Sequence, residues 1–351
     1  MLRQLKVLLS LGVCLFACGS ASRIDAQPTN YSAQLFSAAS NYTGMFGSIG
    51  AGSLQMQEGC GVAVNPTNND IFISDFGNSR IEMWTATGQW IGAFTANSGV
   101  NDRLLSPCGL AFAPNGNLYV ADPDGNHILV FQPLNPGQTA WGVVSAFGQY
   151  GTNPGQLHIP YGVAILHGSS PSNFLVYVAD TYNNRIAVFN ASGQFVSEFG
   201  QSGSGNGQLN FPIGLAFDAS NNLVVTDEFN NRLQKFSSGG IYMGQFGGTG
   251  QAPPNPLLPF GIAICPQTAG APYAGRIMVA DIANSRVVVY SSGGAYVAQF
   301  DLRMTGSQLV TPLAIAFFSD GRQVITDEIF NNNNNGGGGG GCGNDCVTVK
   351  K

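Results

Sequence analysis

The sequence predicts an all-β fold, a six-bladed β-propeller of four-stranded blades that is closed by N-terminal strands completing the last blade. A short pattern recurs six times along the 351 residues, and each full repeat holds four short β-rich runs separated by Gly, Asn and Pro turns. The truncated last repeat is complemented by a half-repeat near the N-terminus. Apolar residues alternate within the runs, as in sheets stacked face to face, and no long amphipathic helical pattern is present.

The first segment, residues 1–26, has the pattern of a signal peptide. Arg3 and Lys6 precede the apolar run VLLSLGVCLFA, which is short for a bilayer span and is followed by small residues. We expect cleavage before Gln27, a secreted or extracellular mature protein and no transmembrane span. A lipoprotein box ending in Cys18, which would give a lipid anchor, is the alternative.

The propeller is expected over residues 27–331. Its central motif reads VADTYNNRIAVF from Val178, preceded by PYGVAI at Pro160 and followed by a short strand that ends in Phe199. Further copies of the central motif begin at Ile73, Val120, Val225 and Val279, and the corresponding strand-ending residues are Phe94, Phe147, Phe246 and Phe300.

The two chain ends predict how the ring closes. The sixth repeat begins as ITDEIFNNN from Ile325 and stops after two strands. Residues 33–47 read AQLFSAASNYTGMFG and align with IAVFNASGQFVSEFG of another repeat, so Phe46 supplies the sixth Phe. Because a half-blade alone would expose a strand edge, we expect the N-terminal strands to complete the last blade. Residues 332–351 remain as an Asn/Gly-rich tail that contains cysteines.

The motifs P-x-G-[VIL]-A, V-A-D and N-[NS]-[RH]-[IVL] resemble those of the NHL-repeat propellers, most literally in Asn126, His127 and Ile128. The resemblance extends over residues 31–331 and implies a six-bladed propeller, which the leader makes an exported member of the family. It implies no particular activity, because a shared fold does not fix a shared function.

An Asp recurs once per repeat, and in five repeats an Arg or His follows it by five residues. Because a catalytic residue has no reason to appear in every blade, we interpret these residues as structural. The Asp would accept backbone N–H groups or pair with the Arg, while the intervening Asn residues adopt left-handed turn geometry. Ligand contact is the alternative. The set is Asp75, Arg80, Asp122, His127, Asp180, Arg185, Asp227, Arg232, Asp281, Arg286 and Asp327.

Charge argues against a nucleic-acid partner. Charged residues make up 9% of the chain, the formal net charge is −5, and the 14 basic residues are scattered. Phosphate backbones require clustered Lys and Arg, which this sequence does not provide.

The family resemblance suggests one specific enzyme for comparison, the peptide-amidating lyase, in which three histidines bind zinc in a related propeller. The three histidines of this chain, His127, His158 and His167, occupy inequivalent places in the repeats. The residues between Pro and Gly at the start of each inner strand should form an apolar ring without the carboxylates that a hard cation needs. They are Cys60, Cys108, Tyr161, Ile213, Phe260 and Leu313. We therefore expect no catalytic residue, no metal site and no cofactor.

Five cysteines follow the leader, in a compartment where disulfides form. One hypothesis bonds Cys342 and Cys346 to Cys60 and Cys108, so that the tail is tethered across the end of the channel. A local Cys342 to Cys346 bridge, a Cys60 to Cys108 bond between adjacent blades and an intermolecular bond are the alternatives. Cys265 is expected to be a buried core thiol.

The functional expectation is a non-catalytic exported module that binds protein or glycan, or that assembles outside the cell through its blade faces or tail. Tyr161, Phe260 and His158 are the candidate ligand-binding residues at the channel rim. The alternative is a propeller lyase or hydrolase with a metal site built from irregular loops. The sequons at Asn30, Asn41 and Asn190 are candidate glycosylation sites.

Overall fold

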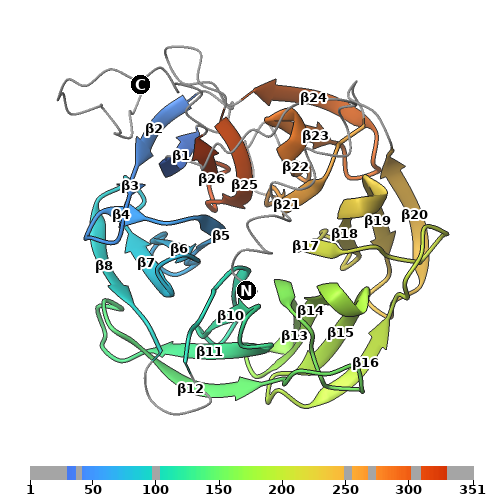
Figure 1. Ribbon diagram of the computed structural model, residues 1–351, viewed down its shortest axis with the longest axis horizontal. Helices are drawn as coiled ribbons and strands as arrows, with labels where there is room; N and C mark the ends of the chain where they lie inside the picture. The colour runs from blue at the N-terminus through green and yellow to red at the C-terminus, as the bar shows by residue number, and fades with distance from the viewer. Residues whose placement is uncertain are drawn as a thin grey trace, which may run out of the picture.

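The computed structural model describes residues 30–36, 42–96, 103–248, 255–267, 274–301 and 310–329. These residues form four-stranded antiparallel sheets arranged around a central axis, each with one strand beside the axis and another at the rim (Figure 1). The predicted all-β propeller of four-stranded antiparallel blades is therefore confirmed.

Five blades are each built from one continuous segment, with their strands paired in chain order from the axis outward. The first comprises β5 (Gly59–Val64), β6 (Ile71–Asp75), β7 (Arg80–Trp84) and β8 (Trp90–Phe94). The second comprises β9 (Leu110–Phe112), β10 (Leu118–Asp122), β11 (His127–Pro133) and β12 (Trp141–Phe147). The third comprises β13 (Pro160–Ser170), β14 (Asn173–Asp180), β15 (Arg185–Asn190) and β16 (Phe195–Phe199). The fourth comprises β17 (Pro212–Phe217), β18 (Leu223–Asp227), β19 (Arg232–Phe236) and β20 (Tyr242–Gly247). The fifth comprises β21 (Pro259–Ile264), β22 (Ile277–Asp281), β23 (Arg286–Tyr290) and β24 (Tyr296–Asp301).

A further four-stranded sheet joins the two ends of the described chain. Its order is β2 (Tyr42–Phe46), β1 (Asn30–Phe36), β26 (Gln323–Ile329) and β25 (Val310–Phe317). β1 pairs antiparallel with β26 along its whole length, from Asn30 opposite Ile329 to Phe36 opposite Gln323. A short parallel pair, β3 (Ser48–Ile49) and β4 (Gln55–Met56), lies in the connection that leads into β5.

The core lies between neighbouring sheets rather than within one of them. Tyr177 and Val188 of the third blade, for example, pack in one cluster with Leu215 and Phe236 of the fourth. The composite sheet has core clusters on both sides. Ile325 packs with Met278 of the fifth blade, while Phe318 and Val324 pack in another cluster with Ile71 and Trp84 of the first.

The strand-ending phenylalanines fill the rim side of these interfaces. Each described pair places the Phe of one sheet against an aromatic residue that ends, or nearly ends, the third strand of the next sheet. Phe46 in β2 makes the same contact with Trp84, with ring centroids 4.7 Å apart. The other pairs are Phe94 with Phe131, Phe147 with Phe189, Phe199 with Phe236, and Phe246 with Tyr290.

Glycines bring neighbouring inner strands together at the axis. A Cβ added to the Gly of each P-x-G or equivalent motif would meet a backbone carbonyl oxygen of the next inner strand closer than 3.0 Å, which real Cβ atoms essentially never show. The pairs are Gly61 with Cys108, Gly109 with Tyr161, Gly162 with Ile213, Gly214 with Phe260, and Gly261 with Leu313. The motif glycine is thus required by close approach of two backbones.

In the five continuous blades the second strand leads into a tight turn, which in three of them is a 3-10 turn: η1 (Thr181–Asn183), η2 (Glu228–Asn230) and η3 (Ile282–Asn284). The residue after such a turn is left-handed, as predicted for the Asn positions; φ is +53° at Asn184 and at Asn231. The Asn184 Oδ1 atom accepts a 2.9 Å hydrogen bond from the Phe211 N–H of the next blade. The turn therefore orients its own hairpin and also fixes the loop that enters the neighbouring blade.

Candidate functional site

The repeat Asp and Arg residues form a buried network that holds the loop entering each blade. The Asp180 carboxylate accepts hydrogen bonds from the His158 N–H at 2.7 Å and from Arg185 Nε at 2.8 Å. The Nη1 and Nη2 groups of Arg185 donate to backbone carbonyls of the same entry loop at Thr152, Asn153 and Gln156. The side chains are saturated by the fold itself, so this geometry fits the structural interpretation.

The other blades repeat this arrangement with small changes. Entry-loop N–H groups of Gln57, Ser106, Asn210 and Leu257 donate to Asp75, Asp122, Asp227 and Asp281, respectively. Arg80, Arg232 and Arg286 pair with the Asp of their own blade. Asp327 in the composite sheet is likewise buried.

His127 is the exception among the repeat cations. Its Nε2 atom lies 3.3 Å from an Asp122 carboxylate oxygen, but the geometry is not that of a hydrogen bond. A single imidazole also cannot reproduce the several carbonyl contacts made by an Arg fork. In the second blade the entry loop is held at this position by the Leu105 and Ser106 N–H groups, which donate to Asp122.

A disulfide joins the first two blades at the axis. Cys60 and Cys108 are bonded to each other, with their Cα atoms 4.9 Å apart. The hypothesis that the tail cysteines bond to Cys60 and Cys108 is therefore wrong, because the close approach of adjacent inner strands brings the two thiols within bridging distance. Cys342 and Cys346 lie outside the described residues. Cys265 is buried, as expected, and carries a free thiol.

The end of the channel where the inner strands begin is called the mouth here. Tyr161 of β13 and Phe260 of β21 meet there with ring centroids 6.1 Å apart, edge to face and half-buried. Cys60, Cys108, Ile213 and Leu313 at the equivalent positions are buried. None of these six residues carries a charge. The contact between Tyr161 and Phe260 brings two of the three candidate ligand-binding residues together.

The third candidate, His158, belongs to a row of rings beside the mouth. Its imidazole lies 5.0 Å from the ring of Tyr150 and 5.1 Å from that of Tyr182. The row continues to Phe211, 4.7 Å from Tyr182, and to Phe229, 4.5 Å from Phe211. We call these five residues the aromatic row. It runs over the entry loops and turns of the third and fourth blades, and Tyr150 is 67% exposed.

Carboxylates that sequence reasoning missed also lie at the mouth. Glu228, the first residue of η2, is only 8% exposed and interacts electrostatically with Tyr161 and Tyr182. Glu58 and Asp124, from the loops of the first two blades, act on Tyr161 in the same way. The ring positions are uncharged, but the loops around them bring acidic groups to the mouth. The one sequence signal was an acidic residue directly after the repeat Asp at position 227.

Burial controls the ionisation of these groups. Removal from water raises the pKa of Glu228 to about 8, and no second cause contributes. Burial also raises the pKa of Tyr161 and of Tyr182, and the negative charge of Glu228 adds to both shifts. In the folded protein Glu228 is therefore substantially protonated at neutral pH, unless a cation joins it.

The three histidines do not converge. His158 lies in the aromatic row, His127 faces Asp122, and His167 lies near the far end of β13. In the part of the chain that the structure describes, no group of three or more His, Cys, Asp or Glu side chains could hold a metal ion.

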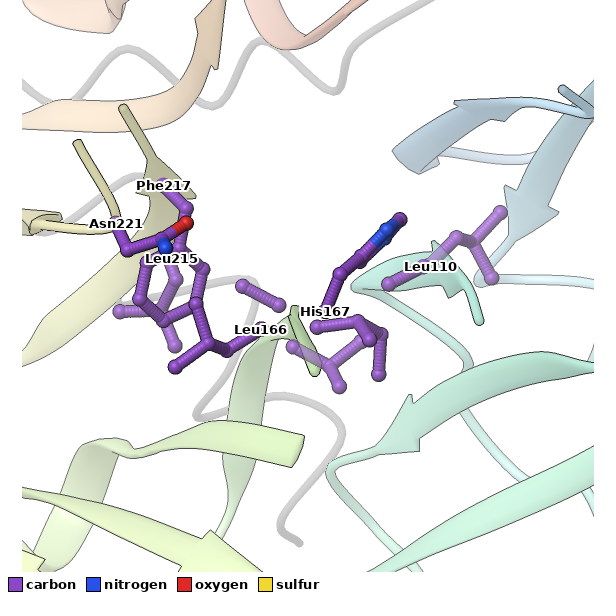
Figure 2. Close-up of a pocket in the computed structure, with 10 residues that line it drawn as sticks. Leu110, Leu166, His167, Leu215, Phe217 and Asn221 are labelled. Carbon is purple, nitrogen blue, oxygen red and sulfur yellow. The ribbon is translucent and has the colours of Figure 1, made fainter. Parts of the chain in front are cut away.

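A pocket lies toward the other end of the inner strands. It has a volume of about 480 Å³ and is lined by residues of β9, β13 and β17, with His167 and Asn221 as its polar side chains. Figure 2 shows Leu110 and His167 on one side of this pocket and Phe217 and Asn221 on the other. Its lining on β13 runs from Val163, two residues after Tyr161, to His167, which is six residues after Tyr161, or about 20 Å of extended strand.

The remaining sequence predictions are tested only in part. Asn190 lies in a turn where its side chain already bonds to Gln194, Asn30 begins β1, and Asn41 lies outside the described residues, as do the leader and the tail. No helix among the described residues is long and apolar enough to cross a membrane.

Comparison with known proteins supports the family resemblance. Residues 209–236, which cover the end of one entry loop and the first three strands of the fourth blade, match the NHL repeat. The RING finger protein nhl-1 of Caenorhabditis elegans is 40% identical over 72 residues, which are 20% of this chain and 7% of that protein. The brain tumor protein of Drosophila melanogaster is 39% identical over 66 residues, or 19% of this chain and 6% of that protein. The alignments thus span only a small part of these relatives.

Solved structures share the fold at low sequence identity. A streptogramin B lyase aligns with a TM-score of 0.55 and 12% identity, over 87% of this chain and 95% of its own. A catalytically inactive virginiamycin B lyase from Staphylococcus aureus, solved with quinupristin, gives 0.52 and 14%, over 88% and 98%. A chain of a nidogen/laminin complex gives 0.51 and 15%, over 78% and 94%. At such identities these similarities establish the fold alone.

Proposed function

We propose that this β-propeller, which carries an NHL repeat at residues 209–236, is an exported, non-catalytic recognition module that binds a protein partner at the mouth and the aromatic row. The N-terminal leader, residues 1–26, is the sequence feature that supports export. The composite sheet of β1, β2, β25 and β26 serves as the sixth blade, since it packs on both the first and the fifth blade and closes the ring.

The aromatic row is the observation that carries this proposal. Five rings from the entry loops and turns of two adjacent blades lie within 5.1 Å of their neighbours along a single row, and Tyr150 projects into solvent. Loops on a rigid scaffold commonly carry binding residues, and aromatic side chains dominate the energetics of protein interfaces. The repeat network and the inter-blade contacts hold these loops in place, so little ordering is needed when a partner binds.

A peptide selection tests this function. A displayed random-peptide library is panned against the wild-type protein, and the enriched peptides are measured on Tyr182→Ala and on Ile241→Ser. Ile241 is 72% exposed and lies in the β19 to β20 turn, at the end of β19 opposite η2. We expect the enriched peptides to bind the wild type and Ile241→Ser alike, and to bind Tyr182→Ala about tenfold or more weakly.

Enriched peptides that bind Tyr182→Ala as tightly as the wild type would overturn the assignment to this surface. Glycan binding and self-association, which the composition also allows, are checked with a glycan array and by sedimentation of the wild-type protein. A Tyr182-dependent signal on the array without enriched peptides would replace the protein partner by a glycan.

A lyase or hydrolase is the second candidate, and Glu228 is the observation that favours it. A carboxyl group with its pKa raised to about 8, lying beside two tyrosine side chains, has the properties of a general acid or base. Incubation with quinupristin, the compound bound in one solved structure of the same fold, followed by mass spectrometry, separates the two candidates. Consumption by the wild type that is lost in Glu228→Gln would establish catalysis.

A further inference from the structure

Glu228 differs from the other buried acids at the ends of the second strands. Asp227, next to it in the chain, is paired with Arg232 at 2.8 Å, and Glu82 elsewhere is paired with Arg80. Glu228 is more than nine-tenths buried, yet within the described residues its carboxylate has no hydrogen bond or ion pair. A buried carboxylate without a partner is unfavourable, so such a group is stabilised by protonation, by water or by a ligand from outside its own chain.

The surroundings of Glu228 define the complementary ligand. Tyr161 and Tyr182 lie close enough to feel its charge, and Phe260 packs against Tyr161. Glu58 and Asp124, from the loops of the first two blades, also act electrostatically on Tyr161. Carboxylates repel anions, whereas ring faces and carboxylates together attract an organic cation.

We propose that the mouth binds an arginine side chain of the protein partner, whose guanidinium pairs with Glu228 and lies against the rings of Tyr161 and Tyr182. This inference rests on the proposed recognition function and specifies what the partner presents. A guanidinium is planar, stacks on aromatic faces, is less strongly hydrated than an ammonium and offers two parallel donors to one carboxylate. It therefore suits a surface made of rings and one buried acid better than lysine does.

Binding of this cation would offset the free-energy cost of burying the Glu228 carboxylate. In the free protein burial favours the protonated acid, while a guanidinium beside it favours the carboxylate. The acidic net charge of −5 and the negative groups around the mouth favour the approach of a basic partner.

Two small probes test the proposal on the full-length protein. N-acetyl-arginine amide and N-acetyl-citrulline amide have nearly the same shape, but only the first is charged. Titration by NMR is expected to show that the arginine probe binds the wild type about tenfold or more tightly than the citrulline probe, with shifts in the Tyr161 and Tyr182 rings.

Charge-matched variants locate the effect. Glu228→Gln should abolish the preference for arginine, while Asp320→Asn should keep it. Asp320 is an exposed surface acid paired with Arg322, and each variant replaces one carboxyl group by its amide. Tyr182→Leu provides a second test that leaves Glu228 in place, and it should weaken the arginine probe about fivefold. Equal binding of both probes to the wild type, or a preference that survives in Glu228→Gln, would overturn the proposal.

The outcome can be separated from that of the proposed function. Enriched peptides that need Tyr182 but contain no arginine, or that tolerate its replacement by citrulline, would leave the recognition function standing and refute the arginine assignment. Loss of Tyr182 dependence altogether would remove both.

Discussion

Replacement of Gly162 by Ala tests the idea that the ring depends on direct contact between inner strands. A Cβ at this position would overlap the carbonyl oxygen of Ile213 in the next blade, and ordinary van der Waals contact begins only at 3.4 Å. The position of a Cβ is fixed by its own backbone and the oxygen is a backbone atom, so the clash cannot be relieved by rotating a side chain. The β17 strand would have to move by more than about 1 Å.

The size of the effect follows from what that movement breaks. The carbonyl of Pro212 accepts a 2.7 Å hydrogen bond from Thr181 Oγ1, and the Phe211 N–H donates at 2.9 Å to Asn184. Loss of these two inter-blade bonds costs about 1 kcal/mol each, and overpacking adds about 1–3 kcal/mol. We expect Gly162→Ala to lower the free energy of unfolding by about 3–5 kcal/mol, which corresponds to roughly 4–7 °C in Tm for a protein of this size.

Urea and thermal unfolding, followed by tryptophan fluorescence, measure this change. Gly239→Ala is the matched control, because its added Cβ would have its nearest contact at 3.8 Å, with the Ser237 hydroxyl. The control should stay within about 0.5 kcal/mol of wild type. If Gly162→Ala unfolds at the same urea concentration as Gly239→Ala, close packing at the axis does not hold the blades together.

Three further predictions concern stability. Asn184→Ala removes the acceptor for the Phe211 N–H and places Ala at a φ of +53°, so the urea midpoint should fall by the equivalent of about 1–3 kcal/mol; an unchanged midpoint would contradict this. The double variant Cys60→Ser with Cys108→Ser removes a bond between residues 48 positions apart, and the chain-entropy account predicts that the free energy of unfolding falls by about 4 kcal/mol. An unchanged free energy of unfolding would show that the bond does not form in solution. The pKa of Glu228 is raised from 4.5 to about 8 on folding, so its stabilising contribution is complete below pH 4.5 and is lost as the pH rises through about 8; Glu228→Gln should flatten this decline in denaturation curves at pH 5 to 9, and parallel curves for both proteins would refute the assigned pKa.

The sequence was sufficient for the features that repeat. Each copy of the motif places one Asp, one left-handed Asn or Ser and one Phe, and each does the same work in every blade where it is described. The pairing of β1 with β26 also followed from the sequence, because an unpaired half-blade at one end and a matching half-repeat at the other leave one arrangement that covers both edges.

Prediction was less successful where residues from different repeats meet. The sequence placed Cys60 and Cys108 at equivalent sites but favoured a bond to the tail, since the spacing of inner strands is not visible in a repeat pattern. It identified Tyr161, Phe260 and His158, yet it missed Tyr182 and Glu228, whose positions in the repeat hold a shared residue type in only two of the six copies: aromatic at Tyr182 and Phe229, acidic at Glu228 and Glu328.

What the sequence determined by itself was therefore the blade, its turns, its repeat network and the order in which the strands pair, since all of these depend on short-range patterns copied along the chain. Only the tertiary structure decided which individual side chains meet at the mouth. The inner strands approach until glycine backbones touch carbonyl oxygens, and this closeness makes the Cys60 to Cys108 bond possible and encloses Glu228 among rings. Such contacts join residues of separate blades, so their chemistry arises from the closed ring and not from any one repeat.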